Sequence, residues 1–519
     1  MASPITLTAP NNTSYSQPTG LFINNEFVAA KSGETIETVN PFDESLIAKV
    51  AAAGPEDVDV AVAAARAAFK NPAWRGLSAA DRGALLYKLS ELCERDKHIL
   101  ATIDAWDNGK PYQVALDEDL AETVAVFKYY GGWADKIYGQ TIETSDAKLA
   151  YTRHEPIGNL YMAAWKLGPA LACGNTVVLK AAEQTPLSVL YLGTLIKEAG
   201  FPPGVINIIN GYGRTAGAAL AEHLGVDKIA FTGSTATGKA IMKAASVNLK
   251  NITLETGGKS PLIVFDDADL DQAVKWSHVG IMGGMGQVCT STSRIYVQDT
   301  IYDKFLDRFK EYTVENTTSG SQFDEKTTHG PQISKAQQEK ILSYVESAKA
   351  EGGRLLLGGK PGADKGYFVE PTIFADTKNH MKAVREEIFG PFVVIQSFSS
   401  DEDAIEKAND TEYGLGAAVF SRDIVRAHKA AAAIEAGMVW INSSQDSHFG
   451  IPFGGYKQSG IGRELGQYAL SAYTQVKAVH EEPEAETSRD SFKGQGGTEY
   501  AFIEGSYCGE LTIWPECWP

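Results

Sequence analysis

Short apolar segments alternate with helical segments between residues 176 and 247, and this alternation constrains the fold more than any other feature. The apolar segments are T-V-V-L-K (176–180), V-I-N-I-I-N (205–210) and K-I-A-F-T-G (228–233). The stretches that follow them, about 186–199, 215–224 and 237–247, have helical patterns. Short buried strands that alternate with helices are typical of a parallel, doubly wound sheet. The sequence therefore predicts an α/β protein in which these three strands share one sheet.

A second series of the same kind runs from residue 261 to about 442, so two α/β lobes are expected. Its strands are predicted at P-L-I-V-F, R-I-Y-V-Q, F-V-V-I-Q and M-V-W-I-N. A chain of 519 residues is too long for one ordinary hydrophobic core, which agrees with two or three lobes. Upstream, residues 56–70 and 80–106 each have the pattern of an amphipathic helix.

The two ends of the chain lack these patterns. Residues 1–19 are polar, and we interpret them as a short disordered arm. They contain no basic region followed by an apolar one, so we expect no secretory signal and a cytoplasmic protein. Segment 481–519 contains nine acidic and two basic residues, and we predict a mostly disordered tail there.

Composition excludes several classes of function. The net charge of −18 argues against a nucleic-acid partner, since phosphate contacts need clustered Lys and Arg. No apolar run approaches the ~20 residues of a membrane span. Five cysteines, an odd and small number, suit a reducing compartment better than a disulfide framework. H-E-x-x-H and C-x-x-C are absent and the nine histidines are scattered, so no metal site is expected.

Two reactive side chains lie in settings of small residues, 34 positions apart. Glu255 belongs to L-E-T-G-G-K-S-P (254–261) and Cys289 to G-Q-V-C (286–289). A cysteine is a strong nucleophile as the thiolate and where a substrate can reach it. A nearby carboxylate that can take a proton from a thiol or a water would complete an acyl-transfer site. Alone, the cysteine would be read as inert core and the glutamate as a surface charge.

Two glycine-rich loops each follow a predicted strand and precede a predicted helix. G-Y-G-R-T-A-G (211–217), which contains Gly213, is similar to a dinucleotide fingerprint with one extra residue. F-T-G-S-T-A-T-G-K-A (231–240) has the spacing of a phosphate loop, but Ala240 replaces the hydroxyl residue that would hold magnesium. Ser234 and nearby amides could instead bind a dinucleotide pyrophosphate without a metal. Plain helix capping is the alternative for both loops.

Taken together, the motifs resemble those of the aldehyde dehydrogenase superfamily, specifically its NAD(P)-dependent, non-acylating enzymes. The similarity covers about residues 20 to 480. Besides the segments around Glu255, Ser234 and Cys289, it includes V-V-L-K-A-A-E-Q-T-P (177–186), E-E-I-F-G-P (386–391) and P-F-G-G-Y-K-Q-S-G-I-G-R-E (452–464).

The resemblance implies oxidation of a small-molecule aldehyde to an acid. Cys289 would attack the aldehyde, hydride would leave to the nicotinamide, and water activated by Glu255 would hydrolyse the thioester. Trp165 would form a wall of the aldehyde tunnel.

The resemblance also implies a set of cofactor contacts. Lys180 and Glu183 match contacts to the adenosine ribose, and a carboxylate there favours NAD because it would repel a 2′-phosphate. Ser234 matches a pyrophosphate contact. Glu387 and Phe389 match residues that hold the nicotinamide ribose and ring.

The architecture implied by the resemblance is a Rossmann-type cofactor lobe, an α/β catalytic lobe and a small β arm that pairs subunits into a homodimer or homotetramer. The expected boundaries are a disordered arm at 1–19, an NAD-binding domain at 20–129 and 148–256, a catalytic domain at 257–465, an oligomerisation arm at 130–147 and 466–485, and an atypical tail at 486–519.

Three departures from the family pattern stand out. Three residues, 159–161, separate Gly158 from Met162, so about ten residues are missing, the length of a strand with its turn. In the family this segment is a central strand that ends in P-W-N-F-P, and its asparagine supplies the oxyanion-hole amide; Asn159 is the one candidate substitute here. An aromatic residue and an asparagine before the cysteine are replaced within 282–284. Acidic residues follow V-K-A-V-H (476–480), where an apolar pairing strand is expected.

Two origins for these departures remain open: a misplaced exon boundary in the gene model, or a degenerate paralogue. Three functions also remain open. The first is an NAD-dependent aldehyde dehydrogenase, and the second is a catalytically impaired binding or structural protein of the same fold. The third is an acyl-transferase that uses Cys289 without a nicotinamide.

Overall fold

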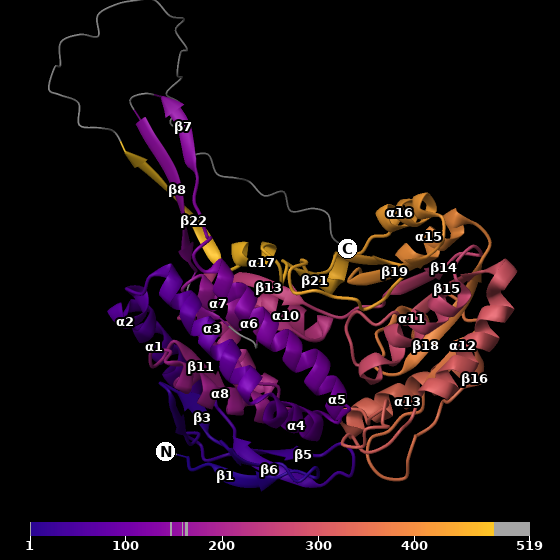
Figure 1. Ribbon diagram of the computed structural model, residues 1–519, viewed down its shortest axis with the longest axis horizontal. Coiled ribbons are helices and arrows are strands. Elements are labelled where there is room, and N and C mark those ends of the chain that lie inside the picture. Colours follow the sequence, from indigo (N-terminus) through magenta and orange to yellow (C-terminus); the bar gives the residue numbers. More distant parts are fainter. Residues whose placement is uncertain (1, 146–147, 158, 161–163, 482–519) are drawn as a thin grey trace, which may run out of the picture. The chain divides into compact units, whose positions relative to one another are not determined.

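The computed structural model describes residues 2–145, 148–157, 159–160 and 164–481, with the backbone alone described at 159–160. The chain divides into two compact units, one of residues 1–139 and 153–477 and one of residues 140–152 together with 478 onward. The first unit contains two α/β lobes, and Figure 1 shows their elements in chain order.

The first lobe extends from β1 to β13. Its strands are β1 (Ile5–Thr8), β2 (Ser14–Gln17), β3 (Leu21–Ile23), β4 (Glu26–Val28), β5 (Thr35–Val39), β6 (Leu46–Ala51), β9 (Asn159–Leu160), β10 (Thr176–Lys180), β11 (Ile206–Ile209), β12 (Lys228–Thr232) and β13 (Asn251–Glu255). Its helices are α1 (Pro55–Lys70), α2 (Pro72–Arg75), α3 (Ala79–Arg95), α4 (Lys97–Asn108), α5 (Tyr112–Val114), α6 (Ala121–Trp133), α7 (Ala164–Ala172), α8 (Leu187–Ala199), α9 (Ala218–Glu222) and α10 (Thr235–Ala245), with short turns η1 (Ala115–Leu120), η2 (Gly213–Gly217) and η3 (Ser246–Asn248).

Helices cover both faces of the first-lobe sheet, because successive apolar side chains of β10 point to opposite faces. Val177 and Leu179 are buried on one face in a cluster with residues of α3, α6, α7 and α8. Val178 points to the other face and joins residues of α1, α9 and α10. A strand that is apolar at every position because both faces are covered is typical of a parallel sheet. The three strands predicted between 176 and 233 are present, although they do not share one continuous ladder.

The ladder of the first lobe is interrupted where the sequence is short. One sheet has the order β4-β3-β11-β10-β9, and a separate sheet has the order β12-β13-β21, with β21 formed by Gly460–Ile461. Within the described residues, β9 pairs parallel with β10 at two positions, Asn159 with Thr176 and Leu160 with Val177. β12 lies beside β9 but, within the described chain, is hydrogen-bonded to β13 alone. The described residues of this lobe therefore form two separate sheets on either side of this point. Tyr161, Met162 and the Asn159 side chain lie outside the described residues.

The second lobe extends from β14 to β20 and contains one continuous sheet. Its strands are β14 (Pro261–Val264), β15 (Arg294–Gln298), β16 (Arg354–Leu357), β17 (Thr372–Ala375), β18 (Phe392–Phe398), β19 (Gly416–Phe420) and β20 (Met438–Ile441). Its helices are α11 (Leu270–Met282), α12 (Tyr302–Asn316), α13 (Lys335–Ala350), α14 (Lys382–Arg385), α15 (Asp401–Asn409) and α16 (Ile424–Ala433), with turns η4 (Gly283–Gly286) and η5 (Asp299–Ile301). After β20 come η6 (Lys457–Ser459), β21 and α17 (Tyr468–Ser471).

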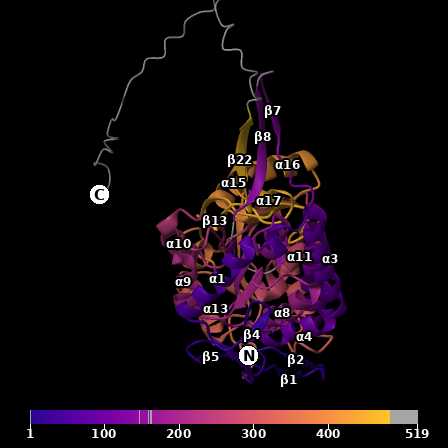
Figure 2. The ribbon, with the colours of Figure 1, turned by 90° about the vertical axis from the view of Figure 1, so that its left-hand side faces the viewer.

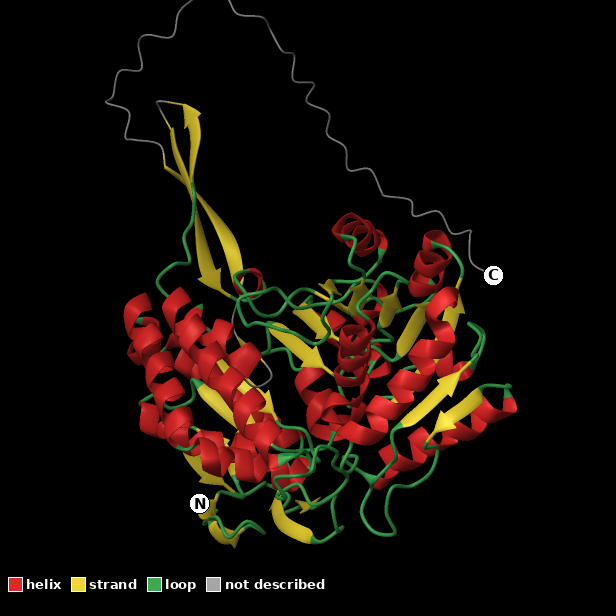
Figure 3. Ribbon diagram, turned by 45° about the vertical axis from the view of Figure 1, so that its right-hand side comes forward, coloured by secondary structure: helices red, strands yellow, loops and turns green. Residues whose placement is uncertain are grey.

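The seven strands of the second lobe are ordered β16-β17-β18-β15-β14-β19-β20, and all neighbours except β16 and β17 are parallel. Figure 3 shows helices on both sides of these strands. Leu262 and Val264 pack with residues of α11 and α12, whereas Ile263 packs with residues of α15 and α16. The four strands predicted in this region are all present.

Three sequence predictions differ from the structure. Residues 1–19 are not a disordered arm throughout, because Ile5–Thr8 and Ser14–Gln17 pair as an antiparallel hairpin (Figure 2). Tyr15 and Gln17 are buried, and the Gln17 amide donates to the Leu187 carbonyl at 3.1 Å. The helix predicted over 80–106 is two helices, α3 and α4, because the chain breaks at Asp96.

The arm predicted at 130–147 and 466–485 is also shifted. Residues up to Trp133 belong to α6, whose Tyr130 is fully buried in the first-lobe core. The hairpin is formed by β7 (Thr141–Ser145) and β8 (Lys148–Pro156), which pair antiparallel. β22 (Thr474–Glu481) belongs to the same three-stranded sheet. The tail predicted at 486–519 lies outside the described residues, and no helix of the described chain is long and apolar enough to cross a membrane.

Candidate active site

Cys289 lies where three loops meet. It follows η4 in a loop of the second lobe and is partly buried. The Gly257–Gly258 pair, just after β13, passes directly against it: a Cβ at Gly258 would lie 2.2 Å from the Cys289 carbonyl oxygen. A Cβ at Gly257 would lie 2.4 Å from Oε2 of Glu387. Glycine is therefore required at both positions for steric reasons, since any side chain there would displace Cys289 or Glu387.

Glu255 ends β13 and is 2% exposed. Neither of its carboxylate oxygens has a hydrogen-bond partner within the described chain. Burial raises the pKa of Glu255 well above its ordinary value, and the charge of Glu464 raises it further, while Lys166 and Arg463 oppose the shift. Gly454 passes close to this carboxylate, because a Cβ there would lie 3.0 Å from Oε1. A buried carboxyl with a raised pKa and unused hydrogen-bonding capacity can accept and release protons.

The thiol of Cys289 is electrostatically disfavoured as a thiolate in this state. Burial raises its pKa to about 12, and the charges of Glu255 and Glu387 act in the same direction. The backbone N–H groups of Cys289 and Thr290 oppose this rise in the pKa. Both predicted catalytic residues, with Glu387, are thus close enough to influence one titration.

A buried ion pair behind Glu255 was not singled out from the sequence. Lys166 of α7 pairs with Glu464, with Nζ and Oε1 2.5 Å apart and both side chains under 5% exposed. The Lys166 ammonium also donates to Oγ1 of Thr232 at 2.9 Å. The signal available was a lysine inside the apolar segment A-W-K-L-G-P-A-L-A, because a buried lysine needs a partner.

Trp165 contributes an aromatic wall. Its ring meets that of Phe453 edge-on, with centroids 4.9 Å apart. Trp165 and Cys289 are both partly buried and pack against the same hydrophobic cluster. Phe453 belongs to the quoted P-F-G-G-Y-K motif, but its contact with Trp165 could not be read from spacing.

Glu387 and Phe389 lie in one loop, and that loop is strained. Oε1 of Glu387 accepts the Gly258 N–H at 3.0 Å. Phe389 has φ of +61°, which is uncommon for an aromatic residue. The Gln337 amide donates to the Phe389 carbonyl at 2.6 Å and holds this conformation. Such strain concentrates at functional sites.

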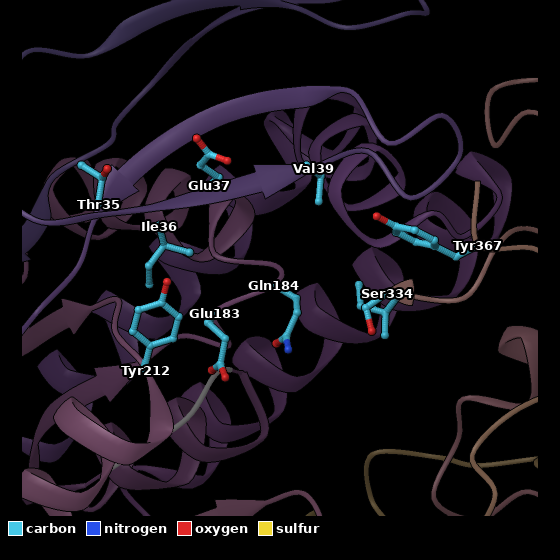
Figure 4. Close-up of a pocket in the computed structure, with 10 residues that line it drawn as sticks. Thr35, Ile36, Glu37, Val39, Glu183, Gln184, Tyr212, Ser334 and Tyr367 are labelled. Carbon is cyan, nitrogen blue, oxygen red and sulfur yellow. The ribbon is translucent and has the colours of Figure 1, made fainter. Parts of the chain in front are cut away.

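Glu183 lines a cavity of about 500 Å³ (Figure 4). The carboxylate of Glu183 is about one-third exposed, and the wall also includes Gln184, Tyr212 and Ser334. The Lys180 ammonium donates to the carbonyls of Ala181 and Gly211 at 2.8 and 2.7 Å, and its third direction faces Glu183 at 3.5 Å. Burial lowers the pKa of Lys180, and Glu183 opposes this shift.

Ser234 and Gly213 lie outside the described lining of this cavity. Ser234 is the N-cap of α10, and its Oγ accepts the Thr237 N–H at 3.2 Å. Gly213 begins η2, and a Cβ there would meet nothing within 4 Å. The close approach expected of this loop occurs at Gly211, where a Cβ would lie 2.7 Å from that of Ala216.

Comparison with known proteins places the chain. The model of the aldehyde dehydrogenase family matches residues 27–479. The chain belongs to the aldehyde dehydrogenase family. It is 52% identical over 477 residues to an aldehyde dehydrogenase of Emericella nidulans, which covers 90% of this chain and 95% of that protein. It is 50% identical over 471 residues to the mitochondrial aldehyde dehydrogenase of Rattus norvegicus, at 88% and 91% coverage.

Among solved structures, the NAD⁺ complex of an aldehyde dehydrogenase from Bacillus cereus aligns with a TM-score of 0.89 and 48% identity. The alignment covers 90% of this chain and 97% of that one. The family and the α/β aldehyde dehydrogenase fold predicted from the sequence are therefore confirmed.

Proposed function

We propose that this aldehyde dehydrogenase oxidises an aldehyde to a carboxylic acid with NAD. The observation that supports this most directly is the convergence of Cys289, Glu255 and Glu387 around Gly257–Gly258. A nucleophile, a base and a carboxylate within reach of a ribose are the parts that this reaction needs. The relatives agree, since they are aldehyde dehydrogenases and one was solved with NAD⁺.

In the proposed mechanism, Cys289 is the nucleophile. Its sulfur attacks the aldehyde carbon to form a thiohemiacetal, and oxidation leaves a thioester on the same sulfur. The backbone N–H groups of Cys289 and Thr290 stabilise the thiolate before attack. Trp165 and Phe453 exclude water from the side of the aldehyde chain.

Glu255 serves the second half of the reaction as general base. It takes a proton from the water that hydrolyses the thioester and releases the acid. Its raised pKa makes it a stronger base than an exposed glutamate. Burial is the main cause of this shift; of the neighbouring Lys166–Glu464 pair, Glu464 raises the pKa further and Lys166 lowers it.

The residues of the first lobe fit a dinucleotide. NAD, when bound, supplies the oxidant for the thiohemiacetal. Glu183, about one-third exposed at the cavity wall, would accept hydrogen bonds from ribose hydroxyls, and Lys180 would donate to the same ribose in place of its 3.5 Å contact with Glu183. Ser234 and the first amides of α10 would bind the pyrophosphate. Gly213 leaves open space beside that loop, and Glu387 and Phe389 would hold the nicotinamide ribose and ring.

Assembly and location complete the proposal. A homodimer or homotetramer formed through the β7–β8 hairpin, in the cytoplasm, fits the sequence-based expectation. Size-exclusion chromatography with light scattering of the whole chain would measure the oligomeric state.

A second candidate is a catalytically impaired member of the family. It is favoured by β9, which pairs over only two residues where the family has a central strand. One assay separates the two: purified protein, NAD and a panel of aldehydes, followed by NADH absorbance. Turnover with at least one aldehyde supports the enzyme. NAD binding in a calorimeter without any turnover supports the impaired protein and contradicts the enzyme.

A further inference from the structure

A cavity lined by residues of β12, β13 and α17 has a positively charged wall. Its volume is about 370 Å³, within the range of small-molecule pockets. Lys228 of β12 and Arg463, which follows β21, both line it. Among the described residues of its wall none is acidic, and the others are apolar residues, a glycine, hydroxyl residues and one asparagine. This wall is cationic in a chain whose net charge is −18.

The cavity beside Glu183 has the opposite charge. Glu37 and Glu183 line it, and its described lining residues include no lysine, arginine or histidine. The two cavities share no described lining residue. The cationic cavity is therefore separate from the cavity proposed for the cofactor, and its charge predicts a different ligand.

Lys228 presents a buried charge to the cationic cavity. The residue is 3% exposed, and its ammonium donates to Oγ1 of Thr253 at 2.6 Å. The ammonium also lies 5.3 Å from the centre of the Tyr473 ring. Among the described residues no carboxylate forms an ion pair with Lys228, because Glu464, which acts on it electrostatically, is paired with Lys166. A buried ammonium without a carboxylate is unfavourable, and a bound anion would offset this.

The charged form of Lys228 persists at neutral pH. Burial lowers its pKa to about 8, the charge of Lys166 acts in the same direction, and Glu464 opposes the shift. Since this pKa is above 7, most of the side chain remains an ammonium at pH 7. An ammonium has three N–H donors, and the hydroxyl of Thr253 accepts one of them.

Arg463 has donors left for the same ligand. Its Nη1 donates to the carbonyls of Gly455 and Gly462 at 3.1 and 2.7 Å. Within the described chain, its Nε and Nη2 make no hydrogen bond and its guanidinium makes no ion pair. Two carbonyls thus hold one side of the planar group and leave the other N–H groups for an oxyanion, which a guanidinium binds in a fixed geometry.

We propose that this cavity binds a small oxyanion with two or more negative charges, recognised by Lys228 and Arg463. Phosphate and a dicarboxylate share this chemistry, since the oxygens of both accept hydrogen bonds from an ammonium and a guanidinium. The inference goes beyond the proposed function, because it requires neither NAD nor an aldehyde.

Titration calorimetry of the whole protein tests the proposal. Inorganic phosphate and succinate are titrated separately at pH 7.5, with the ionic strength held constant by sodium chloride. We expect saturable binding of one anion per chain for at least one of the two. Binding of both supports a general oxyanion site, and binding of one identifies the source as phosphate or carboxylate. No saturable binding of either up to about 10 mM would overturn the proposal.

A charge introduced into the cavity tests the location of the site. Asn251 is exposed and lines the cavity, so Asn251→Asp adds a negative charge there without a change of shape. It should weaken anion binding by about threefold or more. Asn71→Asp makes the same change at an exposed helix N-cap outside the cavity, where aspartate caps as well as asparagine, and should keep the wild-type affinity. Equal weakening by the two variants would show a response to net charge alone and would contradict the site.

Removal of a recognition residue should have the larger effect. Lys228→Met keeps the length of the side chain and removes the ammonium, and should weaken binding by about tenfold or more. Thermal melts give a second readout, since the anion should raise the Tm of wild type and Asn71→Asp but not that of Lys228→Met. If Lys228→Met does not fold, Arg463→Gln takes its place with the same expected loss. Unchanged affinity in the recognition variant would place the ligand elsewhere and overturn the proposal.

Discussion

The sheets of the two lobes are built from the same kinds of segments, yet one is continuous and the other is interrupted. In the second lobe every interior strand has two hydrogen-bonded neighbours, with registers of three to five residue pairs. In the first lobe, among the residues that the structure describes, β9 pairs with β10 at two positions and not with β12. Core packing is kept beside this short pairing, because helices on both faces bury β10.

The two lobes also divide the proposed chemistry. Cys289, Glu387 and Phe389 come from loops of the continuous second lobe, whereas Glu255 ends β13 of the interrupted sheet. Attack on the aldehyde should therefore depend mainly on an intact framework. Deacylation and cofactor binding should depend on the lobe whose described strands form two separate sheets.

The largest effect is expected from the nucleophile in the intact lobe. Cys289→Ser should reduce kcat/KM by more than about 10⁴-fold, since an unactivated hydroxyl is a far weaker nucleophile than a thiolate. NADH absorbance with a good aldehyde measures this loss. Near-normal oxidation by the variant would remove Cys289 from the mechanism and with it the division between the lobes.

Next in size is the base of the interrupted lobe. Glu255→Gln should lower steady-state turnover by about 10²–10⁴-fold, the usual contribution of a general base. A burst of NADH in stopped-flow absorbance should remain, because oxidation precedes hydrolysis in the proposed sequence. Loss of the burst together with turnover would instead assign Glu255 to thiol activation or to structure.

Repairing the interrupted sheet should raise activity. Insertion after Leu160 of a family-like strand that contains P-W-N-F-P would extend β9 toward β12 and supply an amide for the oxyanion. One such donor is worth about 10²–10³ in kcat, and the steady-state assay measures the gain. An insert of equal length made of Gly and Ser is the control. If neither insert raises kcat, the short strand does not limit the reaction.

Features that depend on neighbouring residues could be predicted from the sequence, whereas contacts between residues far apart in the sequence could not. The strands 176–180 and 294–298 could be predicted to the residue, because apolar runs and breakers are local signals. The motifs also identified Cys289 and Glu255. The Lys166–Glu464 pair could not be predicted, since it joins residues 298 positions apart in the sequence. The N-terminal hairpin was missed because its buried residues alternate with exposed ones over only four positions.

A smaller effect is expected for cofactor choice. Glu183 should favour NAD over NADP by about ten- to a hundredfold in kcat/KM, because its carboxylate would repel a 2′-phosphate across a few ångströms. Glu183→Gln should narrow the ratio by improving use of NADP. Steady-state kinetics with NAD and with NADP measure this ratio of kcat/KM. Equal kcat/KM for the two cofactors in the wild type would contradict the assignment of Glu183 to the ribose.

The smallest effect concerns the stability that Glu255 costs the interrupted lobe. Its pKa is raised in the folded protein from an ordinary value of 4.5, so the folded state binds more protons than the unfolded state above that pH. The free energy of unfolding therefore falls as the pH rises from 4.5 through the raised pKa. Glu255→Gln removes the charge and keeps the shape, and should stabilise the protein by roughly 1–3 kcal/mol at pH 8 and by little at pH 4.5.

Thermal melts of wild type and Glu255→Gln across this pH range measure the effect, with Glu387→Gln as the comparison. Burial raises the pKa of Glu387 too. Glu387, however, accepts a hydrogen bond from the Gly258 N–H. A glutamine at this position would keep that bond only when its amide oxygen, rather than its nitrogen, faces Gly258. Glu387→Gln should therefore gain less at pH 8 than Glu255→Gln. The difference in free energy of unfolding between wild type and Glu255→Gln could instead be the same at pH 8 and at pH 4.5. That result would mean that Glu255 is solvated or paired in solution. The isolation on which its role as a base depends would then be absent.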